Sequence, residues 1–175
     1  MHPLPVHAAH PFPLIRGGGL FLLVVGFSVM LGAVSPRRVW SLLVAGAIVG
    51  AAATIAAAMR LAAPLGRPSE FQIGSLAAAV LVEAIAIGWV GSRLRAANER
   101  RRTLSILVVV GAHFFLMGFA FGPLVVLLGV LSVANAIAGL RAATTTWLTF
   151  WFIDGALKAG AGAAMLWFAP RITWW

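Results

Sequence analysis

Six long apolar runs, separated by short polar breaks, dominate the chain. They cover residues 17–34, 39–59, 73–92, 103–121, 123–140 and 146–168. Each is close to the ~20 residues that an α-helix needs to cross ~30 Å of hydrocarbon, and each is bounded by Arg, Pro or a polar cluster. The pattern predicts an all-α integral membrane protein, a six-transmembrane-helix bundle that forms a single domain over residues 1–175.

The break between the fourth and fifth runs consists of Gly122 and Pro123 alone. Proline is well tolerated at the first position of a helix, so a tight hairpin is expected there. The alternative is one kinked segment over 103–140. At ~1.5 Å per residue that segment would span nearly twice the bilayer, so we predict two helices.

The first run has some features of a signal peptide, since Arg16 precedes it and small residues lie near its end. Arg37 and Arg38 follow the run directly, as a stop-transfer flank does, which favours an uncleaved helix. Residues 1–16 precede the run and are expected to form a short N-terminal arm.

The composition also indicates a lipid environment. The 175 residues are 62% hydrophobic and only 10% charged, with a mean hydropathy of +1.01. That leaves too little polar surface to cover a soluble protein of this size. The absence of cysteine excludes disulfides, iron–sulfur clusters and thiolate chemistry. No nucleophile, nucleotide or metalloprotease signature occurs, so the sequence implies no cofactor strongly and leaves its identity unknown.

Arginine placement predicts the orientation of the bundle. Four Arg residues fall on one side, namely Arg16, Arg60, Arg67 and Arg171. Eight fall in the breaks on the other side, namely Arg37, Arg38, Arg93, Arg95, Arg100, Arg101, Arg102 and Arg141. Because cytoplasmic loops carry the excess of Lys and Arg, we expect both termini on the outer side of the cell membrane.

The third break is the densest charge run and holds Arg93, Arg95, Arg100, Arg101 and Arg102. It is a candidate site for anionic lipid headgroups, at ~1 kcal/mol per Arg. Its simpler role is to fix the orientation of the neighbouring helices. No aromatic residue is interleaved with these Arg residues to stack on a base, so nucleic acid is not an expected partner.

Tryptophans fall near the predicted helix ends. Trp40, Trp89, Trp147 and Trp151 lie near one set of ends, and Trp167, Trp174 and Trp175 lie near the other. Tryptophan is enriched at both membrane–water interfaces, so we interpret all seven as interfacial anchors.

Four ionisable residues lie inside the apolar runs: Glu83, His113, Asp154 and Lys158. Glu83 and His113 are each ten residues into their runs, ~15 Å deep, and Asp154 is at about the same depth. A charge at the bilayer centre costs ~2.5 to 3.5 kcal/mol on insertion scales, so these side chains should face one another or a wet cavity.

The spacing suggests two pairs among the four residues. Asp154 and Lys158 are four apart with the acid first, the favourable order for an intrahelical ion pair. Glu83 and His113 lie on consecutive helices at matched depth, where they could share a proton. Asn135 in the fifth run could extend the set. The alternative for each residue is a contact that orients the helices and moves nothing.

Two faces of small residues, Gly46–Gly50 and Gly118–Gly122, allow close helix approach. They are compatible with packing inside the bundle, with a homodimer or with another membrane protein as partner.

The segment Gly111-Ala112-His113-Phe114, which follows an Arg-rich loop, resembles the fourth helix of small bacterial membrane proteins grouped into families of unknown function. Asp154-Gly155 in the last run extends this likeness. The resemblance implies a multi-spanning protein of the bacterial inner membrane, and it transfers no activity.

Three functions remain open. The first is a transporter-like protein in which Glu83, His113 and Asp154 bind protons, cations or a small solute, with Lys158 as counter-charge. The second is a structural or accessory membrane subunit whose buried charges specify helix packing. The third is a membrane metalloenzyme in which Glu83, His113 and Asp154 hold one divalent metal. Convergence of these residues on a water-filled path favours the first, and separate helix contacts favour the second.

Overall fold

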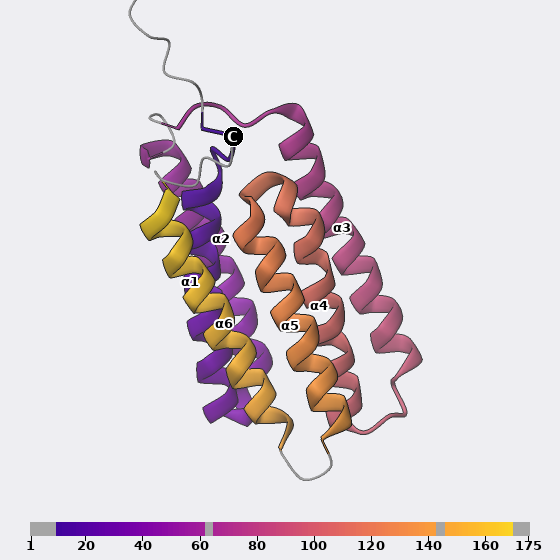
Figure 1. The fold of residues 1–175 in the computed structure, drawn as a ribbon. Helices are drawn as coiled ribbons and strands as arrows, with labels where there is room; N and C mark the ends of the chain where they lie inside the picture. Colours follow the sequence, from indigo (N-terminus) through magenta and orange to yellow (C-terminus); the bar gives the residue numbers. More distant parts are fainter. Residues whose placement is uncertain (1–9, 62–64, 143–145, 170–175) are drawn as a thin grey trace, which may run out of the picture.

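The computed structural model describes residues 10–61, 65–142 and 146–169, and every structural statement below concerns this part of the chain. Its regular structure is entirely helical (Figure 1). The elements are α1 (Ile15–Val34), the short 3₁₀ helix η1 (Pro36–Arg38), α2 (Val39–Leu61), α3 (Glu70–Arg93), α4 (Glu99–Phe121), α5 (Pro123–Arg141) and α6 (Trp147–Phe168).

Helix ends follow local chemistry. Gly122 has a φ of +94°, a left-handed conformation that favours glycine, and Pro123 occupies the first turn of α5. The predicted break at this point is therefore confirmed. At the start of α3, the Ser69 side chain and Gln72 form a reciprocal capping box. Asn98 accepts a hydrogen bond from the backbone N–H of Arg101 at the start of α4.

Consecutive helices run in opposite directions, and they form two groups (Figure 1). In one group α1 packs against both α2 and α6; in the other α4 packs against both α3 and α5. The groups meet mainly through α5 and α6, with smaller contacts of α4 with α6 and with α1. The bundle is therefore two helix triplets joined along one side.

Glycines bring α1 and α6 into close contact. Gly26 faces Gly155, and Gly19 faces Gly162, so both pairs recur at a spacing of seven residues. A Cβ placed at Gly155 would lie 2.7 Å from the carbonyl oxygen of Gly26. Side chains larger than hydrogen would therefore separate the two backbones.

The two small-residue faces that the sequence indicates pack inside the chain. Gly46 lies against Ser28 and Gly50 against Phe21, both of which belong to α1. Gly118 faces Val126 of α5. These glycines serve the contacts between α1 and α2 and between α4 and α5.

Five helices, α1 to α5, are long and apolar enough to cross a membrane, which indicates a membrane protein. The remaining helix, α6, has 22 residues but carries Asp154 and Lys158, which lower its mean hydropathy. The expectation of six spans is thus met by six helices, of which five have the composition of a span.

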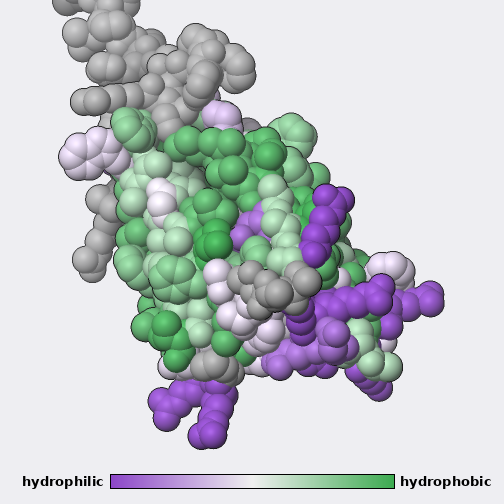
Figure 2. Space-filling view, turned by 60° about the horizontal axis from the view of Figure 1, so that its bottom comes forward, coloured by the Kyte–Doolittle hydropathy of each residue, from purple (hydrophilic) through white to green (hydrophobic). Residues whose placement is uncertain are grey.

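The arginine-rich breaks lie at one end of the bundle. Figure 2 shows hydrophilic side chains gathered at this end and a largely hydrophobic surface beyond it. Arg16 and Arg67 belong to the opposite end, and Arg171 lies outside the described residues. Alternating helix directions account for this grouping, because breaks one, three and five share an end.

The tryptophans differ in solvent exposure, so the prediction that all seven are interfacial anchors holds for some of them only. Trp89 and Trp167 are exposed, as expected for anchors, and Trp174 and Trp175 lie outside the described residues. The interpretation of Trp151 as an anchor is wrong, because it is only 2% exposed and packs edge-on against Trp40 and Trp147. It lies one turn inside α6, on the face that carries Asp154 and Lys158, and that face points inward.

The described part of the predicted N-terminal arm contacts the bundle. The backbone N–H of His10 donates to the carbonyl of Leu65, and the Gln72 amide donates to the carbonyl of Pro11 at 2.7 Å. Ile15 and Arg16 already belong to α1, so the arm ends two residues earlier than expected. Residues 1–9 lie outside the described residues.

Candidate functional site

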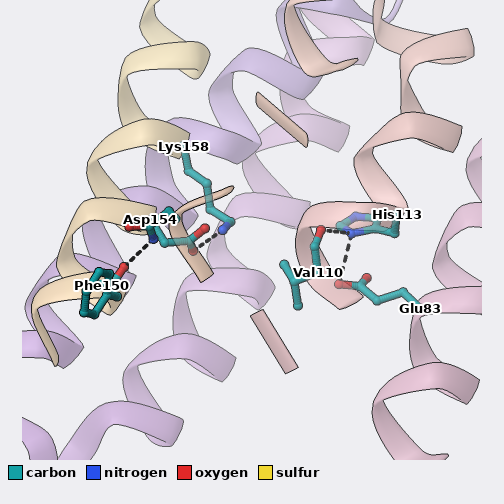
Figure 3. A network of polar contacts seen from close by, with 7 residues as sticks. Glu83, Val110, His113, Phe150, Asp154 and Lys158 are labelled. Carbon is teal, nitrogen blue, oxygen red and sulfur yellow. Dashed lines mark hydrogen bonds and ion pairs between the residues drawn. The ribbon is translucent and has the colours of Figure 1, made fainter. Parts of the chain in front are cut away.

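The four ionisable residues of the apolar helices form two pairs (Figure 3). Lys158 and Asp154 form the ion pair that their spacing on α6 predicts. Glu83 of α3 lies beside His113 of α4, with Oε1 of the carboxyl group 3.3 Å from Nδ1 of the imidazole. Matched depth in the sequence thus corresponds to contact in space.

Both pairs line one cavity of about 360 Å³. It lies between the two helix triplets, with α1, α2 and α6 on one side and α3 and α4 on the other. Figure 3 shows the two pairs facing each other across this space. The cavity therefore brings all four groups to one space.

Most other side chains around the cavity are apolar, and four are aromatic: Phe21, Trp40, Phe114 and Trp151. The Lys158 ammonium lies 5.5 Å from the centroid of the Phe114 ring. Phe114 also stacks on His113, with ring centroids 4.3 Å apart. Aromatic faces attract cations, so these rings add to the negative character of the cavity.

Hydrogen bonding defines the tautomer of His113. Its Nδ1 lies 2.5 Å from the carbonyl oxygen of Val110, which only accepts hydrogen bonds. Nδ1 therefore carries a proton and donates it, with Glu83 as the second neighbouring acceptor. Among the described residues no hydrogen bond reaches Nε2.

Burial differs between the pairs. The side chains of Asp154 and Lys158 are 1% and 4% exposed, whereas Glu83 is 23% exposed. Oδ1 of Asp154 and Nε1 of Trp151 are buried without a hydrogen-bond partner in the described residues. Buried polar groups of this kind are uncommon and mark a place where water or a ligand supplies the missing bond.

The cavity is open towards the gap between α2 and α3. These helices are consecutive in the chain, yet α2 packs mainly on α1 and α3 mainly on α4. Ala47 on α2 and Ala84 on α3 both line the cavity, and Ala84 is exposed. A second apolar hollow of about 280 Å³ shares Phe21, Val80 and Met117 with it. The two hollows are therefore adjacent, and Glu83, which is 23% exposed, lines the larger one at its mouth.

Asn135 lies away from this cavity. Its amide donates to the backbone carbonyl of Phe150 at 2.8 Å and so ties α5 to α6. The contact is a packing link of the kind that single amides make between membrane helices.

The arginine side chains of the third break make different contacts. The guanidinium of Arg100 donates to the carbonyls of Gly139 and Ala142 and so caps the end of α5. Arg93 lies over the ring of Trp89. Arg93, Arg95 and Arg101 are exposed, and Arg102 is half-buried.

The metal hypothesis receives no geometric support. In the described ranges no three His, Asp or Glu side chains are grouped closely enough to hold one ion. Asp154 is instead engaged by Lys158, whose positive charge disfavours a cation at the same oxygen atoms.

A family model matches residues 7–174, which includes all six helices. The chain belongs to DUF6609, a family of unknown function. This is consistent with the sequence resemblance to uncharacterised families, although the match does not single out the His113-Phe114 motif. No curated protein and no solved structure matches the chain.

Two parts of the site were not predicted from the sequence. One is Trp151, which could have been found from its position three residues before Asp154, because that spacing places both side chains on the same helical face. The other is the carbonyl of Val110, which orients the imidazole of His113 and has no signature in a side-chain pattern.

Proposed function

We propose that this DUF6609 chain is a transporter-like membrane protein for protons, cations or a small solute, and that it conducts protons at the Glu83–His113 and Asp154–Lys158 cavity. The observation that carries the proposal is that all four ionisable groups of the apolar helices line one space. Packing alone needs only pairwise contacts, and charged groups at membrane depth are costly, so a shared, open cavity favours transport.

The proposal assigns each group a role. Glu83 is the proton acceptor nearest the mouth, and His113 is its relay partner, because its Nδ1 lies 3.3 Å from the carboxyl oxygen. Lys158 offsets the charge of Asp154 and holds the cavity close to electrical balance. Each triplet supplies one pair, so a change in the spacing of the triplets alters the distance between the pairs.

The proposal also places the chain across the cell membrane with both termini outside. The grouping of eight Arg residues at one end of the bundle supports it, since that end is then cytoplasmic. The exposed Arg95 and Arg101 would there meet anionic headgroups.

Proton flux into proteoliposomes that enclose a pH-sensitive dye tests the proposal. With a potassium diffusion potential as driving force, wild-type protein should acidify the lumen faster than protein-free vesicles. Glu83→Gln and His113→Ala should lose this flux. Glu70→Gln is the matched control, because Glu70 lies on the same helix but is exposed at its first turn.

Wild-type flux equal to that of empty vesicles, or a Glu83→Gln protein that conducts normally, would contradict the proposal. The accessory-subunit alternative is then favoured, since it needs the buried charges for packing only. Elution of each variant as a single peak in size-exclusion chromatography separates loss of flux from loss of fold.

A further inference from the structure

When Glu83 is ionised, the cavity carries one negative charge that no other described residue around it balances. Asp154 and Lys158 neutralise each other. A neutral imidazole satisfies the geometry of His113, because Nδ1–H has its acceptor while a second proton on Nε2 would have none among the described residues. An ionised Glu83 is then the only uncompensated charge among the described residues of the cavity lining, and its carboxylate accepts at most the shared Nδ1–H.

The surroundings of Glu83 favour an organic cation over a hydrated metal ion. The walls are aliphatic and aromatic, and four aromatic side chains line the same space. Such walls cannot replace the water shell of a small metal ion, whereas aromatic faces attract organic cations. A volume of about 360 Å³ falls in the range of small-molecule sites.

The mouth lies on the side of the bundle. α2 and α3 do not pack closely against each other, and both hollows that they border have largely apolar linings. If α2 and α3 cross the bilayer, this opening faces the hydrocarbon. A ligand that enters here must dissolve in lipid.

We infer that the cavity binds a hydrophobic organic monocation, which enters between α2 and α3 and pairs with Glu83. This rests on the proposed function and names its substrate class. A carboxylate without a positively charged partner in an apolar space is unfavourable, so Glu83 holds either a proton or the cation. Binding of the cation therefore releases a proton, and proton binding expels the cation.

Equilibrium binding of tetraphenylphosphonium to the purified full chain in detergent tests this inference. We expect saturable binding that weakens on acidification and falls at least about tenfold in Glu83→Gln. Glu83→Asp, which keeps the charge, should retain most of the affinity. The neutral triphenylphosphine oxide and the anion tetraphenylborate should show no saturable binding that depends on Glu83.

A second pair of variants tests the entry route between α2 and α3 and leaves every charged residue unchanged. Ala84→Trp places a large ring on the cavity wall at the mouth and should abolish binding. Ala78→Trp is the matched control, since Ala78 is exposed on α3 and lies outside the cavity lining. It should bind as the wild type does.

The outcomes separate the inference from the proposed function. If proton flux depends on Glu83 but tetraphenylphosphonium does not bind, or binds equally to Glu83→Gln, the inference fails and proton transport stands. If the probe binds through Glu83 while no flux occurs, transport fails and the binding site stands. Preference for the neutral or anionic probe overturns the inference directly.

Discussion

At the scale of single residues, the buried ion pair on α6 is the contact whose loss should lower the stability of the protein most clearly. Asp154 and Lys158 are almost fully enclosed, and one oxygen of Asp154 has no hydrogen-bond partner in the described residues. Two opposite charges that contact each other can remain buried, whereas removal of one partner leaves the other as an uncompensated buried charge. Its main consequence is that the two positions are energetically coupled.

Asp154→Asn should therefore lower stability by about 3 kcal/mol or more, because it leaves Lys158 charged and buried. The double variant Asp154→Asn/Lys158→Met should recover a large part of that loss. Thermal unfolding followed by intrinsic tryptophan fluorescence in detergent measures both. Equal melting temperatures for the single and double variants would show that the pair is not coupled.

Residue contacts could be predicted from sequence only where spacing determines them. The four-residue interval between Asp154 and Lys158 places both on one helical face, and the ion pair follows. Equal depth made contact between Glu83 and His113 plausible, but depth leaves the rotation of each helix open. The inward position of Trp151 was missed because tryptophan near a helix end usually marks an interface.

At the scale of helices, the boundaries follow from the apolar runs and the caps, but the packing partners do not. Polar breaks and proline predicted all six helices, and each observed helix end lies within four residues of the predicted one. The dominant contact of α1 is with α6, the most distant helix in sequence. It depends on glycines at positions 19, 26, 155 and 162, whose pairing is visible only in three dimensions.

Gly155→Ala should destabilise the bundle, because its Cβ would lie 2.7 Å from the backbone oxygen of Gly26 and force α1 and α6 apart. Gly160→Ala on the same helix is the control, since a Cβ there meets nothing within 4 Å in the described residues. Alanine in a helix is favoured over glycine by about 1 kcal/mol, so this control should be neutral or stabilising. Melting temperatures that fall equally in both variants would argue against close packing at Gly155.

At the scale of the whole molecule, the chain consists of two helix triplets that each contribute a charge pair to the cavity between them. The family match spans both triplets, so the cavity belongs to the unit that the family shares. Its existence could not be predicted from sequence. It depends on α2 and α3 packing away from each other, although they are neighbours in the chain.

The central claim is that Glu83 exchanges a proton for a cation inside this cavity. Infrared difference spectroscopy on lipid-reconstituted protein tests it most directly, because a protonated carboxyl group has its own C=O stretching band. Addition of tetraphenylphosphonium should remove this band in the wild type and in Glu70→Gln, and Glu83→Gln should show no such change. An unchanged carboxyl band in the wild type, or the same loss in Glu83→Gln, would contradict the account.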